Sequence, residues 1–136
     1  MSNLSKLRLT VYPNGLASFL VDSNAEEKTA NYTVVINDDS GKTFISTLDG
    51  VTYTLPSIAI GNTITFVNMA EDGAAALNIS PAALDGITYA GSSTDDKDLI
   101  NTKATAKKGD YVTLASLDGV VAWQVVESRG VWAKEA

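Results

Sequence analysis

Four consecutive residues, Ser40-Gly41-Lys42-Thr43, have the order in which a P-loop ends, and a P-loop binds nucleotide phosphates through backbone amides and a lysine. The complete motif requires a further glycine at position 36, where this chain has Ile36. The strand–loop–helix context of a P-loop is missing as well. We therefore interpret this segment as a turn rather than as a phosphate site.

Three aspartates at nearly alternate positions, Asp95, Asp96 and Asp98, could offer oxygen ligands to a calcium ion. A calcium-binding loop also needs a glycine for its sharp turn and a distal glutamate that binds through both oxygens, and neither is evident. Lys97 places a positive charge inside the cluster. A solvated loop is the better interpretation, and we expect no metal-binding residues.

A pair of carboxylates could serve as acid and base in a glycosidase, and the candidates here are Asp85, Asp110, Asp118 and Glu127. Each of the three aspartates stands next to a glycine, which is typical of an aspartate that forms a turn. The chain contains neither His nor Cys, which excludes a Ser-His-Asp triad, a cysteine nucleophile and a zinc–thiolate site. We expect no enzymatic activity, no catalytic residue and no cofactor.

Aromatic side chains could stack on sugars or on bases, and the candidates are Tyr53, Tyr89, Tyr111, Trp123 and Trp132. Stacking on nucleic acid requires basic neighbours, whereas the chain has a formal net charge of −6, so we expect no nucleic-acid partner. Trp123 is followed two residues later by Val125, which predicts that both lie on a core face. Trp132 is expected to close a barrel or an interface.

The basic cluster of the chain consists of Lys103, Lys107 and Lys108, directly before a predicted strand. Lysines at this place commonly protect a sheet edge and increase solubility. Contact with an acidic partner surface is the alternative.

The elements that would position these residues are short runs rich in Val, Ile, Thr and aromatic residues, separated by glycine turns. They cover residues 7–12, 17–22, 31–37, 42–47, 49–56, 61–68, 85–91, 108–119 and 120–133. The pattern predicts an all-β protein, either a compact antiparallel β-sandwich or a small, jelly-roll-like β-barrel. Residues 23–30 could form a loop or one helical turn, residues 69–84 a short helix, and residues 92–108 a projecting polar loop.

The N-terminal segment predicts a hairpin. Leu7, Leu9 and Val11 alternate with polar residues, Pro13-Asn14-Gly15 is a strong turn signal, and residues 17–22 can return as a second strand. We therefore divide the 136 residues into an N-terminal arm or hairpin region (1–30) and a sandwich or barrel domain (31–136). No signal-peptide or membrane-helix pattern is evident, so we expect synthesis in the cytoplasm and no membrane partner.

Several segments together resemble the head decoration (cement) proteins of tailed bacteriophages. They are residues 41–44, 54–56, 61–68 and 108–114, Trp123, and residues 129–132, so the similarity spans roughly residues 41–133. The resemblance implies a non-catalytic homotrimer that binds the major capsid protein on the outer surface of the virion and stabilises the head. Related modules occur in phage fibres, so the alternative is a fibre, spike or base-plate domain that binds host surface glycan through Trp132 or exposed tyrosines.

We expect contacts with the capsid or with other copies at Leu7, Arg8, Leu9 and Tyr12 of the hairpin and at Trp132. A hairpin can add strands to a neighbouring sheet through main-chain hydrogen bonds, and three linked copies multiply weak contacts. If residues 7–12 instead form an ordered strand of the domain, loops such as 23–30 or 92–108 would make these contacts.

Overall fold

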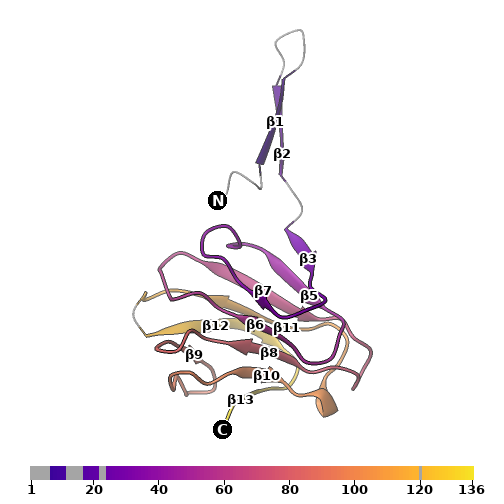
Figure 1. Cartoon of the computed structure of the whole chain (residues 1–136), viewed down its shortest axis with the longest axis vertical. Coiled ribbons are helices and arrows are strands. Elements are labelled where there is room, and N and C mark those ends of the chain that lie inside the picture. The colour runs from indigo at the N-terminus through magenta and orange to yellow at the C-terminus, as the bar shows by residue number, and fades with distance from the viewer. Residues whose placement is uncertain (1–6, 12–16, 22–23, 120) are drawn as a thin grey trace.

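A computed structural model of the chain describes residues 7–11, 17–21, 24–119 and 121–136 (Figure 1). The described residues are essentially all β, with one short 3-10 turn, η2 (Lys103–Thr105). The strands are β1 (Leu7–Val11), β2 (Ala17–Val21), β3 (Ala25–Glu27), β4 (Tyr32–Thr33), β5 (Thr43–Ser46), β6 (Val51–Thr54), β7 (Thr63–Asn68), β8 (Leu77–Ser80), β9 (Gly86–Thr88), β10 (Leu99–Asn101), β11 (Asp110–Ala115), β12 (Ala122–Arg129) and β13 (Trp132–Lys134).

Two sheets pack against each other as a β-sandwich, which confirms the predicted fold class. One sheet has the strand order β13-β10-β8-β6-β4, and the other has the order β3-β5-β7-β11-β12-β9. Within the described residues neither sheet closes into a barrel, so of the two expected architectures the sandwich is the one observed.

The sheets are mixed, whereas we expected antiparallel pairing. From β3 to β11 the chain changes sheet at every strand, and four neighbouring pairs within the sheets run parallel: β3 with β5, β5 with β7, β4 with β6, and β6 with β8. The pairs β7 with β11 and β8 with β10 are antiparallel. Most of the turns that we took for hairpin reversals lead instead to the opposite sheet, whereas the turn between β11 and β12 does return in the same sheet. Each parallel connection therefore contains a strand of the other sheet, which gives it the length that a parallel pair needs.

Alternation along each strand directs apolar side chains into the space between the sheets. In β7 and β11 the inward positions include Ile64, Phe66, Val112 and Leu114, all at most 1 % exposed. Aromatic rings join the two sheets: the ring centroid of Tyr53 in β6 lies 4.9 Å from that of Phe66 and 5.4 Å from that of Phe44 in β5. The core thus holds together elements from most of the chain.

Several local predictions were wrong. Residues 69–84 contain strand β8 rather than a helix, and residues 92–108 contain β10 and the turn η2 rather than one long loop. Within 23–30 the chain forms strand β3, which pairs with β5. In 31–37 only Tyr32–Thr33 is strand, because the chain turns from residue 36 onward.

The N-terminal hairpin has the expected form. β1 and β2 pair antiparallel from Leu7 opposite Val21 to Val11 opposite Ala17. The predicted turn at 13–15 lies outside the described residues. In Figure 1 the hairpin stands apart from the sandwich, beyond strand β3.

Candidate functional site

The predicted contact residues are distributed between the hairpin and the core. Leu7, Arg8 and Leu9 belong to strand β1, and Tyr12 lies outside the described residues. Trp132 is only 5 % exposed, belongs to the hydrophobic core, and donates a hydrogen bond from Nε1 to the Arg129 carbonyl at 3.0 Å. At most the edge of the indole ring is accessible to a partner, so the face of Trp132 cannot stack on a sugar or a base.

The hairpin is a two-stranded sheet, and among the described residues it pairs with no strand of the sandwich. Its register places apolar residues opposite each other at every second position: Leu7 with Val21, Leu9 with Phe19, and Val11 with Ala17. An isolated two-stranded hairpin is marginally stable at best in water, and each of its outer edges carries main-chain groups that can pair with another strand. The hairpin is therefore the element of this fold that gains most from a partner.

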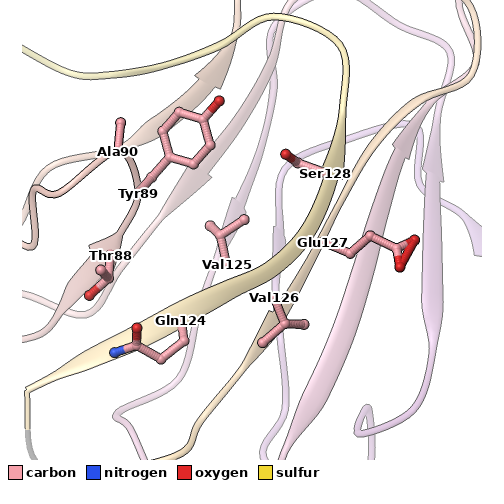
Figure 2. Close-up of a pocket in the computed structure, with 8 residues that line it drawn as sticks. All are labelled: Thr88, Tyr89, Ala90, Gln124, Val125, Val126, Glu127 and Ser128. Atoms are coloured by element: carbon pink, nitrogen blue, oxygen red, sulfur yellow. The ribbon is translucent and has the colours of Figure 1, made fainter.

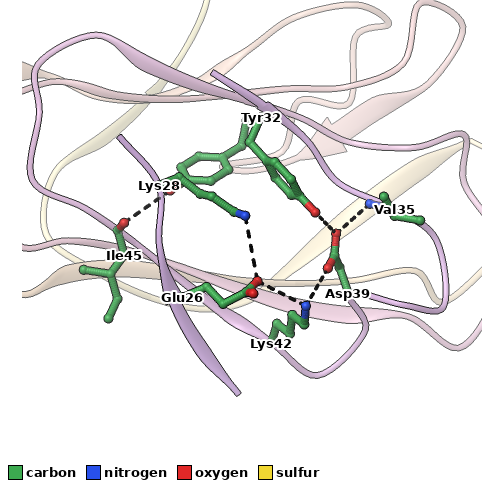
Figure 3. A network of polar contacts seen from close by, with 8 residues as sticks. Glu26, Lys28, Tyr32, Val35, Asp39, Lys42 and Ile45 are labelled. Carbon is green, nitrogen blue, oxygen red and sulfur yellow. Dashed lines mark hydrogen bonds and ion pairs between the residues drawn. The ribbon is translucent and has the colours of Figure 1, made fainter. Parts of the chain in front are cut away.

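Strand β3, which follows the hairpin, is fixed to the sandwich by a network of charged groups (Figure 3). Lys42 Nζ lies 3.1 Å from Glu26 Oε2 in β3 and 3.0 Å from Asp39 Oδ1. Asp39, 2 % exposed, also accepts hydrogen bonds at 2.7 Å from the Tyr32 hydroxyl and from the Val35 amide. The turn that we predicted at Ser40-Gly41-Lys42-Thr43 thus supplies the lysine at the centre of this network.

The electrostatics of the network favour its charged state. Burial alone would raise the pKa of Asp39, but the hydrogen bonds from Val35 and Tyr32 and the nearby Lys42 lower it below its ordinary value. Burial of the Tyr32 hydroxyl and its bond to Asp39 raise the pKa of that tyrosine. Lys28 Nζ lies 3.9 Å from the centroid of the Tyr32 ring and adds a cation–π contact. Sequence reasoning missed Asp39, because its residue type does not distinguish it from the other acids near it, such as Glu27 and Asp38.

A shallow groove of about 350 Å³ lies between β12 and the turn that follows β9 (Figure 2). Tyr89 and Ala90 stand on one side, and Gln124, Val125 and Ser128 lie along β12 on the other. Tyr89 and Val125 both pack against the core, which confirms that Val125 follows Trp123 at the core face. The groove offers hydroxyl, amide and aromatic groups, a combination that can bind a neutral polar ligand.

Two backbone irregularities shape this groove. The register between β11 and β12 shifts after Thr113, because Thr113 opposes Glu127 while Leu114 opposes Val125, so Val126 bulges. Ala90 has a φ of 51°, a left-handed conformation that is uncommon for alanine. Together with Gly91 it forms a two-residue reversal closed by two hydrogen bonds between Tyr89 and Ser92, at 2.9 and 3.0 Å.

The four carboxylates considered for acid–base chemistry do not form a common site. Asp110 and Asp118 accept hydrogen bonds from amides of their own turns, Lys107 and Val121, as expected for turn aspartates. Asp85 accepts one from the Ile58 amide in another loop. Glu127 accepts a hydrogen bond from the Tyr111 hydroxyl, and this bond raises the pKa of Tyr111. Each of these groups has a local structural partner.

The predicted basic cluster lies among acids. Lys103 pairs with Asp49 at 2.9 Å, Lys108 with Glu71 at 3.1 Å, and Lys107 with Asp72 at 3.8 Å, all on the surface. Within the described part of the chain, no group of three or more Asp or Glu residues is placed to hold a metal ion, and Asp95, Asp96 and Asp98 form no such group. No helix among the described residues has the length and apolar character to span a bilayer.

A second buried polar network links the two sheets near the loops that carry these lysines. Asn101 in β10 accepts a hydrogen bond from Asn68 in β7 at 2.8 Å and donates to Asp110 in β11 at 3.2 Å, and all three side chains are at most 2 % exposed. The sequence of β7 could have predicted this network, because Asn68 continues the alternation that places Ile64 and Phe66 on the inward face.

A scan of the chain against models of known protein families found no match, and a search of curated proteins found none either.

Proposed function

We propose that this chain is a decoration protein of a tailed-bacteriophage head, in which three copies bind the outer surface of the capsid and stabilise the contacts between major capsid subunits. The observation that carries the proposal is the hairpin β1–β2, a two-stranded sheet that stands apart from a well-packed sandwich (Figure 1). Main-chain groups at its edges can extend a sheet of the capsid protein. The resemblance of residues 41–133 to decoration proteins supports the same function.

The anchoring of β3 suits this role. A protein that clamps a shell must transmit force from its attachment segment to its body, and β3 joins the two. Its pairing with β5 and the Glu26–Lys42–Asp39 contacts resist displacement of that junction. We propose no catalytic role and no cofactor, because the candidate carboxylates are engaged in turns and surface pairs.

Co-sedimentation of the purified protein with phage heads that have been stripped of their own decoration protein tests the proposal. We expect saturable binding at a fixed ratio to the major capsid protein, and greater resistance of the decorated heads to heat. Bovine serum albumin of equal concentration serves as the control for trapping. Absence of saturable binding to such heads would contradict the proposal.

The groove beside Tyr89 favours a second candidate, a fibre, spike or base-plate domain that binds host surface glycan. Tyr89 is half-buried, and Thr88, Gln124 and Ser128 could bind sugar hydroxyls. Trp132 does not take part, since it is buried in the core. Retention of the protein on immobilised host glycan, lost in Tyr89→Ala, together with no binding to heads, would favour this function over decoration.

A further inference from the structure

Among residues 24–119 and 121–136, the three most exposed large apolar side chains gather at one end of the sandwich. Leu84 is 85 % exposed, Ile60 is 70 % exposed and Leu117 is 62 % exposed. They lie in three loops, residues 57–61, 81–85 and 116–121, which we call the apolar tip; the structure describes all of these residues but 120. Single exposed apolar residues are ordinary, but three neighbouring loops that each carry one mark an interaction surface.

Backbone hydrogen bonds show that the three loops are neighbours. Each pair of loops is joined by at least one bond from a backbone amide, of 2.8 to 3.0 Å. The Ile58 amide donates to the Asp85 carboxylate, the Gly86 amide, directly after the second loop, donates to the Val121 carbonyl, and the Gly61 amide donates to the Ser116 carbonyl. A substituent on Gly119 would also press against the side chain of Ile60. The apolar tip is therefore one surface built from three parts of the chain.

Buried polar groups fix the shape of this surface. Ser116, 1 % exposed, accepts a hydrogen bond from the Asn62 amide at 2.9 Å and donates to the Ala59 carbonyl. Asn62, 3 % exposed, donates from its side chain to the same carbonyl at 3.1 Å. Loops that are already held in place lose little conformational entropy when a partner binds.

The charge distribution indicates which partner the apolar tip fits. It contains no Lys, Arg or Glu, and its two acids are Asp85, which is 8 % exposed, and Asp118, which accepts a hydrogen bond from the Val121 amide. Strands β7, β8 and β11 each connect the apolar tip with the opposite end of the sandwich, where Lys103, Lys107 and Lys108 pair with acids. Two copies of a chain with a net charge of −6 repel each other, and they do so least where few charges lie.

We propose that the apolar tip is the surface through which copies of this chain associate with one another. Each copy brings the same loops, in which Asp118 is the one exposed charge of the described residues, so tips can meet around a common symmetry axis with few like charges near it. The inference rests on the proposed function in so far as decoration requires several linked copies, and it names the surface that links them.

Sedimentation velocity over two decades of protein concentration tests this inference on the full chain. The variant Ile60→Glu/Leu84→Glu replaces two exposed side chains of the apolar tip by charges. The matched control is Leu48→Glu/Val131→Glu, which makes the same change in charge at side chains that are 47 % and 54 % exposed near the opposite end. We expect the dissociation constant of self-association to rise at least about 100-fold in the first variant and less than about threefold in the control. Circular dichroism checks that both variants remain folded.

The inference is overturned if the tip variant associates as the wild type does, if the control dissociates equally, or if the wild type is monomeric at every concentration. Co-sedimentation with stripped heads keeps this result apart from the proposed function. If stripped heads bind the wild type but the tip variant still self-associates, only the inference about the apolar tip is overturned. If the wild type self-associates through the apolar tip but does not bind heads, only the proposed decoration function is overturned.

Discussion

The ammonium group of Lys42 lies 3.0 Å from the Asp39 carboxylate, and the Asp39 side chain is almost fully buried. The same lysine reaches Glu26 in β3, the first strand after the hairpin. A buried charge is costly unless it is paired and hydrogen-bonded, and here the pairing connects the start of the sandwich to the turn before β5. The junction between hairpin and sandwich is therefore sensitive to the ionisation of one carboxyl group.

The first prediction concerns this group. Asp39→Asn keeps an acceptor for Tyr32 and Val35 but removes the charge that faces Lys42, so we expect the free energy of unfolding at neutral pH to fall by about 2 kcal/mol. The folded-state pKa of Asp39 lies below its ordinary value, so its contribution is complete above the unfolded pKa of about 3.9 and is lost as the pH falls through the folded pKa. Urea unfolding of both proteins between neutral pH and about pH 3 measures the difference, which should shrink toward acid.

The exposed pair between Lys103 and Asp49 provides the control. Asp49→Asn removes a similar charge from the surface, where solvent screens it, and should change stability much less than Asp39→Asn does. A difference between Asp39→Asn and the wild type that stays constant from neutral to acid pH would show that the charge of Asp39 is not the cause.

The second prediction tests the close approach of Gly130 to Asp110. Gly130 has a φ of 100°, and a side chain there would overlap the buried Asp110 carboxylate that binds Asn101 and the Lys107 amide. We expect Gly130→Ala to lower the free energy of unfolding by about 2 to 4 kcal/mol, through backbone strain and loss of these bonds. Thermal and urea unfolding measure the loss.

Gly50→Ala separates the two causes. Gly50 also has a left-handed φ, of 79°, but nothing lies within 4 Å of the position a side chain would take. This variant should lose only the strain contribution, about 1 to 2 kcal/mol. Equal losses in the two variants would mean that the contact with Asp110 contributes nothing.

Alternation along single strands could be predicted from the sequence, but the pairing of strands could not. The inward positions of β7 and β11 follow from a period of two, and these strands pair with each other, Phe66 opposite Val112. A short turn after a strand is equally compatible with a return in the same sheet and with a passage to the opposite sheet. We assumed a return in the same sheet, whereas the mixed topology results from passage to the opposite sheet. Strands of three residues, such as β3 and β10, carry too little pattern to be recognised.

In the candidate site, too, some features could be predicted from the sequence and others could not. Turn-forming aspartates were recognised because an adjacent glycine marks them, and Asp110 and Asp118 bind amides of their own turns. The burial of Asp39 was not recognised, because it depends on Tyr32 and Lys42 being brought together by pairing that the sequence does not specify. The groove beside Tyr89 was missed for a similar reason, since its two sides meet only through the parallel pairing of β9 with β12.

The third prediction concerns the turn at this groove. Ala90 and Gly91 both have a positive φ, as in the tight reversal for which Asn-Gly is strongly preferred. Ala90→Asn should therefore raise the free energy of unfolding by about 0.5 to 1 kcal/mol, with an increase of a few degrees in Tm. Differential scanning calorimetry measures it. Ala133→Asn, on the exposed face of β13, is the control and should not stabilise; a Tm that is unchanged or lower in Ala90→Asn would contradict the strain at this position.

The fourth prediction separates the roles of hairpin and sandwich. A variant that begins at residue 24 lacks β1 and β2 but keeps β3 and its contacts with β5 and Lys42. Because the core residues between 24 and 136, from Val34 to Trp132, pack with one another, we expect the Tm of the sandwich to be unchanged. If the hairpin supplies the main-chain contacts with the capsid, binding to stripped heads should weaken at least about 100-fold, since every copy in an oligomer loses its attachment at once. Co-sedimentation at a fixed head concentration measures this, with the full chain and Asp49→Asn as controls that should bind equally. Undiminished binding of the shortened chain would instead place the capsid contacts on the sandwich.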